Sequence, residues 1–226
     1  MVSAAHPLAA EAGYAVLKRG GNALDAAVAV QMVLGLVEPQ SSGIGGGAFL
    51  LYWSEKDKAL TSFDGREAAP AAARPNRFLD PQGKPLDFFE AVVGGRSVGV
   101  PGVLRMLELA HRRHGRLPWA ELFGDAIFEA EEGFPLSPRL HASLEAERFL
   151  RNDPRARQLY YQADGSAKPA GARVVNHAYG LRYFRIRPMA WMYFTQNGHR
   201  SLASTRSRWQ FGHRSALLRS VRRRRR

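Results

Sequence analysis

The residues Asp64-Gly65-Arg66-Glu67 include the side chain in this sequence that is best suited to bind an anionic ligand, the guanidinium of Arg66. They follow an apolar run, so we expect Arg66 to lie just past the end of a β-strand. The planar guanidinium of an arginine fixed there offers two parallel donors to a carboxylate or a phosphate. The alternative is an ordinary surface arginine that pairs with Asp64 and Glu67, and the residues alone leave both interpretations open.

A glycine-rich segment, residues 43–47, precedes these residues and invites comparison with phosphate-binding loops. A dinucleotide-binding glycine motif follows a strand and opens a helix, whereas this segment follows an apolar helix and opens a strand. No Gly-Lys-Ser/Thr follows it, which excludes a nucleotide-binding P-loop. We therefore predict a tight turn in which backbone approaches backbone so closely that a Cβ atom would clash.

The remaining residue types exclude several kinds of site. Cysteine is absent, which excludes disulfide bonds, thiolate metal sites and a cysteine nucleophile. His111 and His114 lie three residues apart on one expected helix face, but the two arginines between them would repel a cation. His6 and His141 form no metal-binding spacing with them. We therefore expect no metal and no cofactor.

The flanking sequence predicts mostly helices around one β-hairpin. Two apolar runs, residues 48–53 and 59–63, are separated by a polar turn and form the expected hairpin. An apolar composition on nearly every side is typical of a buried helix, and residues 23–37 show it. Helices are expected in the ranges 7–18, 23–37, 101–114, 117–132 and 138–150, with a short strand or extended segment at 91–100. The predicted fold class is α+β with a helical majority.

The charge is distributed unevenly along the chain. All 20 acidic residues lie before residue 177, where the lysines and arginines also number 20. Residues 177–226 contain 13 arginines, no lysine and no acid, and therefore carry the whole net charge of +13. We predict two regions, a charge-balanced globular part at 1–176 and an arginine-rich tail at 177–226. One interpretation of the tail is a segment that binds nucleic acid or another anionic surface.

Several long segments occur in one order along residues 1–176. They are MVSAAHPLAAEAG, GGNALDAAVAVQMVLGLVEPQSSGIGGGAFLLYW, DGREAAPAAA, VVGGRSVGVPGVLRMLELAHRRHGRLPW and EEGFPLSPRL. Together they resemble the opening part of the large subunit of γ-glutamyltransferase (γ-glutamyl transpeptidase). The resemblance runs without large gaps to about residue 176, and residues 177–226 do not share it.

The resemblance implies a fold, a substrate and a partner. The family is an N-terminal-nucleophile (Ntn) hydrolase with an αββα sandwich, of which this chain would form a part. Its precursor cuts itself, and the new N-terminal threonine of the small subunit attacks γ-glutamyl amides such as glutathione. The γ-glutamyl group then passes to water or to an amino acid. Arg66 matches the arginine that grips the substrate's α-carboxylate, and Glu67 matches a family acid whose role is left open here.

The nucleophile that the family needs is not found in this sequence. Its threonines are Thr61, Thr195 and Thr205, and none stands in the Thr-Thr-His context of the family's cleavage point. We therefore expect no catalytic residue here, a truncated chain that is inactive alone, and a missing small subunit. Because GC-rich DNA read out of frame yields arginine readily, we interpret residues 177–226 as a frameshifted tail, with anionic-surface binding as the alternative.

The sequence leaves the localisation of the protein unknown. The resemblance favours a periplasmic or extracellular protein, yet residues 1–30 show no basic region followed by an apolar one, as a signal peptide would. No run of about 18 apolar residues occurs, so we expect no membrane span. We also expect no specific nucleic acid among the partners.

Overall fold

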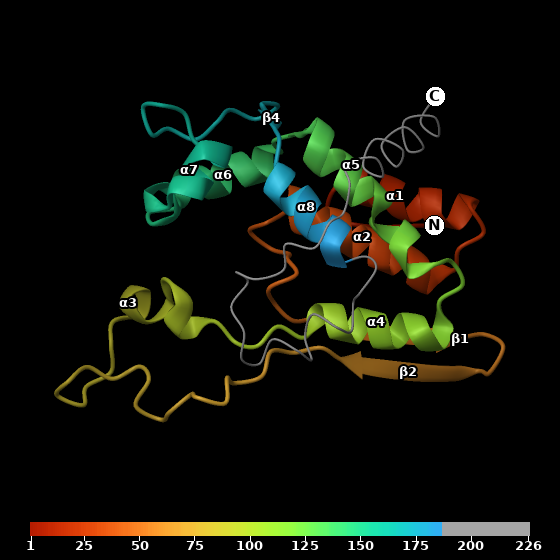
Figure 1. Ribbon diagram of the computed structural model, residues 1–226, viewed down its shortest axis with the longest axis horizontal. Coiled ribbons are helices and arrows are strands. Elements are labelled where there is room, and N and C mark those ends of the chain that lie inside the picture. Colours follow the sequence, from red (N-terminus) through yellow and green to blue (C-terminus); the bar gives the residue numbers. More distant parts are fainter. Residues whose placement is uncertain (187–226) are drawn as a thin grey trace, which may run out of the picture. The chain divides into compact units, whose positions relative to one another are not determined.

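The computed structural model describes residues 1–186 (Figure 1). Within these residues it contains two compact units, one made of residues 1–43 and 107–186, the other of residues 44–106. Helices predominate and one hairpin stands out, which confirms the predicted α+β class.

The elements of the first unit are α1 (Pro7–Lys18), α2 (Ala23–Val37), the end of α4 (Val103–His114), η2 (Trp119–Phe123), α5 (Gly124–Glu132), β3 (Phe134–Pro135), α6 (Pro138–Ala146), η3 (Leu150–Asn152), α7 (Pro154–Tyr160), β4 (Arg173–Val174) and α8 (His177–Ile186). Those of the second unit are β1 (Phe49–Ser54), β2 (Ala59–Asp64), α3 (Phe88–Val92), η1 (Gly95–Ser97) and the first turn of α4.

Helix α2 is the centre of the first unit, as its apolar sequence predicts. Buried residues lie on most of its surface, and α1, η2 and α5 pack against it. Asn22 caps its start through the N–H groups of Leu24 and Asp25, while the Asp25 carboxylate accepts the N–H of Asn22. This reciprocal capping satisfies donors that a helix start leaves unpaired.

The Asp25 carboxylate also joins α2 to a distant turn. Its side chain is 0% exposed, and it accepts the backbone N–H groups of Arg116 at 3.1 Å and Leu117 at 3.2 Å. A buried carboxylate needs such donors because isolation from water is costly. The positive end of the α2 dipole adds a further favourable interaction.

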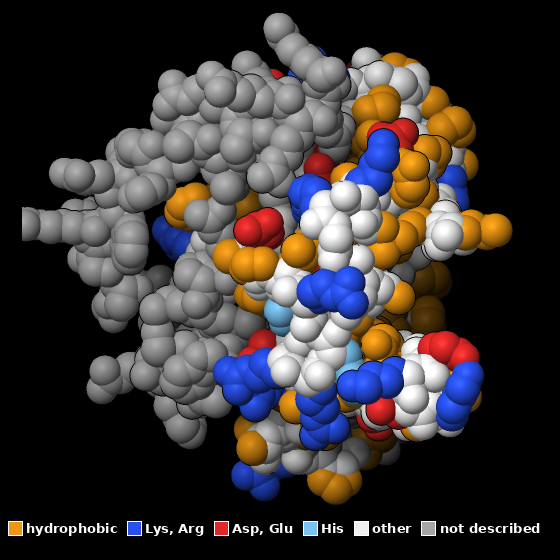
Figure 2. All heavy atoms as spheres, turned by 90° about the vertical axis from the view of Figure 1, so that its right-hand side faces the viewer, with side chains coloured by type: hydrophobic (Ala, Val, Ile, Leu, Met, Phe, Trp, Pro, Cys, Tyr) orange, Lys and Arg blue, Asp and Glu red, His pale blue; other side chains and the backbone are white. Residues whose placement is uncertain are grey.

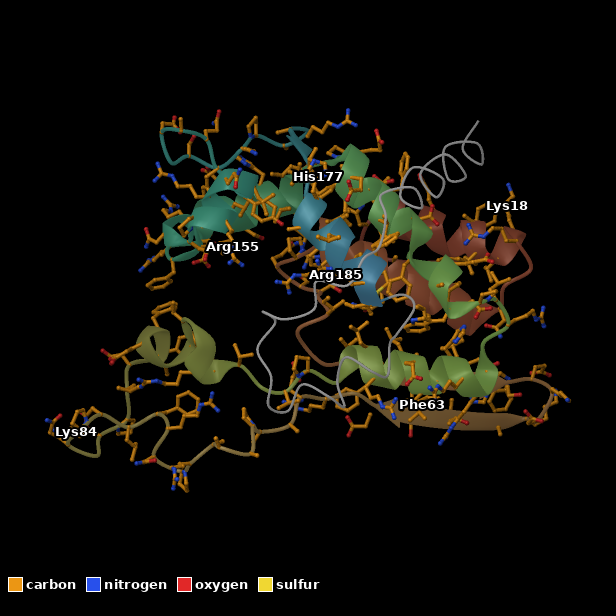
Figure 3. The ribbon with its side chains drawn as sticks, viewed as in Figure 1. Lys18, Phe63, Lys84, Arg155, His177 and Arg185 are labelled. Carbon is orange, nitrogen blue, oxygen red and sulfur yellow. The ribbon has the colours of Figure 1, made fainter. Side chains whose placement is uncertain are left out.

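Helix α8 extends the packed fold beyond residue 176. Tyr183 is 0% exposed, its ring packs edge-on to Phe123, and its hydroxyl donates to the Met32 carbonyl at 2.7 Å. Figure 1 shows α8 running beside α2 and α5, and Figure 3 labels His177 and Arg185 near its two ends. Burial raises the pKa of Tyr183 well above its usual value. The fold thus continues ten residues past the predicted boundary, and residues 187–226 of the predicted tail lie outside the described residues.

Several predicted boundaries were wrong. The helix expected from residue 101 begins at Val103, and the one expected at 117–132 is split into η2 and α5. Residues 88–92 form α3 where a strand or extended segment was expected to begin. Helix α7 was missed because its surroundings are polar, although Asp153 caps its first turn. None of the helices described in residues 1–186 combines the length and apolar character required to cross a membrane.

The buried position of Tyr183 generates a stability prediction. Tyr183→Ala should lower the free energy of unfolding by about 3–5 kcal/mol because it leaves a cavity. Tyr183→Phe should lower it by about 1–2 kcal/mol, since the hydroxyl's hydrogen bonds to the Met32 carbonyl and to Tyr179 are lost. Leu181→Ala, on the same helix at 42% exposed, is the matched control and should change it by less than about 0.5 kcal/mol. Urea unfolding followed by circular dichroism measures all three. Equal effects of Tyr183→Ala and Leu181→Ala would show that α8 is not part of the core.

Candidate functional site

The hairpin delivers Arg66 to the end of a β-ladder. Strands β1 and β2 pair antiparallel from Phe49↔Asp64 to Ser54↔Ala59. Ala48 and Gly65 add two further backbone hydrogen bonds, at 3.3 and 2.9 Å, so the ladder ends one residue before Arg66. The predicted place of Arg66, just past a strand, is confirmed.

The side chain of Arg66 is exposed, and within residues 1–186 its guanidinium makes no ion pair or hydrogen bond. Asp64 instead accepts the backbone N–H of Arg66 at 2.8 Å. The neighbouring acid therefore fixes the main chain and leaves the guanidinium fork unused. The interpretation of Arg66 as a surface arginine paired with Asp64 and Glu67 does not describe this arrangement.

The glycine segment packs against the backbone of Arg66. A Cβ atom on Gly47 would lie 2.6 Å from Oε2 of Glu67, 2.7 Å from the Gly65 carbonyl oxygen and 2.9 Å from Cα of Arg66. No real Cβ atom approaches so closely. Gly47 does not have a positive φ, so the glycine is needed for space rather than for conformation. The predicted close approach of backbone to backbone is confirmed at this position.

Glu67 lies close to three glycines. A Cβ atom on Gly99 would lie 2.8 Å from Cβ of Glu67, and the Glu67 carboxylate lies beside Gly46 and Gly47. The paired backbone hydrogen bonds of Ala68 and Val100, at 3.2 and 2.8 Å, hold this crossing together. Glu67 is exposed, and its chemical role stays open.

The other chemical candidates are scattered and have structural roles. His6 caps α1, and burial lowers its pKa despite the opposing effect of Glu38 and Glu11. His111 and His141 contact the backbone carbonyls of Leu117 and Lys168. Residues 1–186 hold no group of three or more His, Cys, Asp or Glu placed to bind a metal ion.

Of the threonines, Thr61 lies inside β2, where it faces Tyr52 of β1. Thr195 and Thr205 lie outside the described residues. The sequence prediction that no threonine here is the nucleophile therefore stays a prediction.

Gly102 was not among the predicted site residues, yet it lies against the Gly65–Arg66 peptide from the start of α4. The available signal was the second glycine-rich segment, residues 94–102, which was interpreted only as a short strand or extended segment followed by a helix.

A sequence model of the gamma-glutamyltranspeptidase family matches residues 9–194 of this chain. The match extends beyond the boundary expected at residue 176. Glutathione hydrolase proenzyme of Bacillus subtilis (strain 168) is 51% identical over 136 residues, which are 60% of this chain and 23% of that protein. Glutathione hydrolase 3 of Arabidopsis thaliana is 41% identical over 161 residues, 71% of this chain and 24% of that protein.

The solved structure of Helicobacter pylori gamma-glutamyltranspeptidase superposes with a TM-score of 0.79 at 30% identity, over 84% of this chain and 54% of that chain. This similarity confirms the predicted partial Ntn-hydrolase fold. The present chain spans about a quarter of the length of these curated relatives.

These relatives, two glutathione hydrolases and a gamma-glutamyltranspeptidase, give no support to the alternative of a nucleic-acid or anionic-surface binder. Figure 2 shows Lys and Arg side chains interspersed with hydrophobic and acidic ones among the described residues of one face.

The crowding at Gly47 predicts opposite effects of two similar substitutions. Gly47→Ala should destabilise the protein by about 1–3 kcal/mol because the added methyl group meets backbone atoms that cannot turn aside. Gly45→Ala, two residues away, meets nothing within 4 Å. Since Gly45 also lacks a positive φ, its substitution should be neutral or stabilise by up to about 1 kcal/mol. Urea unfolding of both variants decides the matter, and equal effects would contradict the close approach.

Proposed function

This chain belongs to the gamma-glutamyltranspeptidase family, and on that premise we propose that residues 44–106 supply the carboxylate-binding half of a γ-glutamyl site. The observation that carries the proposal is the exposed guanidinium of Arg66 on a main chain held by Asp64 and Gly47. A guanidinium binds a carboxylate through two parallel hydrogen bonds, which fixes orientation as well as charge. The ligand is the α-carboxylate of a γ-glutamyl compound such as glutathione.

The hairpin supports a second part of the proposal, a partner that carries the nucleophile. Large apolar residues lie on one face of the hairpin and are exposed, including Leu51 at 72% and Trp53 at 53%. The register places Leu60, which is also exposed, directly opposite Trp53. A contiguous exposed apolar face of this kind is typical of an interaction surface. We assign it to the small subunit of the family enzyme.

Catalysis by the 226-residue polypeptide alone is not part of this proposal. An N-terminal threonine acts through its own amine, which requires cleavage just before it. Thr61 is internal to a strand, and the residues after Thr195 and Thr205 do not match the family's cleavage sequence. The chain thus contributes binding, and the chemistry belongs to the partner.

The composition of the last residues supports a shift of reading frame, now placed later in the chain. Helix α8 packs as part of the fold through Ile186, and the family resemblance continues to residue 194, so we infer that the change lies after residue 194. Translating the underlying DNA in its other two frames past codon 194 should recover a γ-glutamyltransferase-like sequence. If neither frame does so, the arginine-rich segment is a genuine feature of the protein.

The carboxylate-binding role of Arg66 predicts a specific loss of affinity. Arg66→Ala should weaken glutathione binding by about 10- to 100-fold, as expected when a charged hydrogen-bonding partner is removed. Arg96→Ala, an exposed arginine of the same unit, is the control and should leave binding unchanged. Isothermal titration calorimetry of the folded variants measures both. Equal affinities of the wild type and Arg66→Ala would overturn the assignment.

The absence of a suitable threonine predicts that the purified 226-residue chain will not release p-nitroaniline from γ-glutamyl-p-nitroanilide. The expected rate equals that of a heat-inactivated sample. Turnover clearly above this control would show that the chain holds a nucleophile of its own.

A further inference from the structure

We propose that the first turn of α4 is the element that positions Arg66, acting through the Gly65–Arg66 peptide, with Gly102 and Met106 as its positioning residues. The proposal rests on the proposed function, because Arg66 is taken as the carboxylate-binding group. It adds two residues that lie far from Arg66 in sequence and do not touch the ligand.

Gly102 lies directly against the main chain of Arg66. A Cβ atom on Gly102 would lie 2.4 Å from the Gly65 carbonyl oxygen, 2.8 Å from the Gly65 carbonyl carbon and 2.9 Å from the Arg66 carbonyl oxygen. All three atoms belong to backbone, which cannot rotate away as a flexible side chain can. The contact therefore transmits any change at Gly102 to Arg66.

Met106 continues the same contact one helical turn later. Residues four apart lie on one face of a helix, so Met106 and Gly102 face the hairpin end together. A Cβ atom on Gly65 would lie 2.6 Å from Cβ of Met106 and 2.9 Å from its Sδ. Helix α4 therefore leaves no room for a side chain at Gly65 on the side where Met106 lies.

Hydrogen bonds hold α4 in this place. The N–H groups of Gly102 and Val103 both donate to the Gly46 carbonyl at 3.2 Å, which uses donors that a helix start leaves unpaired. On its other edge Gly65 donates to the Ala48 carbonyl at 2.9 Å. The Gly65–Arg66 peptide therefore lies between the β-ladder and the helix, and a lateral shift of Arg66 requires one of them to move.

This enclosure has a consequence for binding. With the main chain of Arg66 fixed, only its side chain must be ordered when the carboxylate binds, which lowers the entropic cost of association. A two-point contact between guanidinium and carboxylate also tolerates little displacement, because functional geometry must hold within about 0.5 Å. A methyl group at position 102 should displace Arg66 by more than this.

The test compares Gly102→Ala with Gly95→Ala in the 226-residue chain. An alanine Cβ at position 95 meets nothing within 4 Å, and Gly95 has no positive φ, so it is a matched control. The probes are glutathione and its analogue in which the glutamyl α-carboxylate is an amide. Gly102→Ala should weaken glutathione binding by about 10-fold and remove the preference for glutathione over the amide. Gly95→Ala should preserve both.

A merely structural effect gives a different result. If Gly102→Ala only lowers the folded fraction, affinity for both probes falls by the same factor, the preference survives, and the proposal is overturned. Unchanged glutathione affinity in a folded Gly102→Ala protein overturns it as well.

A measurement that needs no ligand distinguishes a failure of this proposal from a failure of the proposed function. The backbone amide of Arg66, identified in two-dimensional NMR spectra with the help of Arg66→Lys, should shift in Gly102→Ala and stay in place in Gly95→Ala. If the wild-type chain does not bind glutathione, the proposed function fails, while the amide signal still decides whether α4 positions Arg66. If Gly102→Ala does not fold, Met106→Leu, a volume-conserving change, takes its place. An Arg66 amide unmoved by Met106→Leu then overturns the proposal.

Discussion

The second unit depends on the absence of a Cβ atom at three glycines, one that forms the Gly65–Arg66 peptide bond and two that pack against it. Gly47, Gly65 and Gly102 come from the glycine segment, the hairpin end and the helix start, and each meets backbone or Met106 closer than a Cβ atom allows. None of them has a positive φ, so the constraint is one of volume. Three segments can share this space only because no side chain fills it. The hairpin, the crossing at Glu67 and the start of α4 are thereby fixed to each other without a large apolar core.

The first unit is held by another kind of constraint, buried acids whose charge is met by local donors. Asp25 accepts backbone N–H groups from Asn22, which caps α2, and from the turn before η2. Glu38, also buried, receives the Gln40 amide and the Ser137 hydroxyl and lies 3.5 Å from the Arg139 guanidinium. Asp25 lies in the first turn of α2 and Glu38 directly follows its last residue, so this strongly apolar helix has both ends fixed by polar contacts. Apolar packing alone would hold α2 in the core but would leave these ends less precisely placed.

The parts of the fold that sequence predicted depend on local signals. Asn22 and Ser137 are capping residues that act within three positions, and both helices begin where they indicate. Arg66 was placed correctly because a strand end is set by the hairpin pattern around it. The contact between Gly102 and Gly65 was not predictable, since nothing local to either residue specifies its partner. Tyr183 was missed for a different reason, because the arginine-rich composition around it concealed a single buried aromatic residue.

The arrangement separates recognition from reaction. Under the proposed function, the residue that orients the substrate lies at the end of the hairpin, while the nucleophile is supplied by a partner that covers the apolar hairpin face. Binding energy contributes to a reaction rate when it holds the reacting groups in a productive geometry. An arginine clamp on a mobile chain would bind a carboxylate without fixing the distance to a nucleophile on another chain. The enclosed Gly65–Arg66 peptide therefore fixes the ligand relative to the hairpin. The exposed apolar face fixes the partner relative to the same hairpin, so both features are needed. Under the proposed function, a chain that possesses both features orients a γ-glutamyl group so that its amide bond faces the nucleophile of the partner.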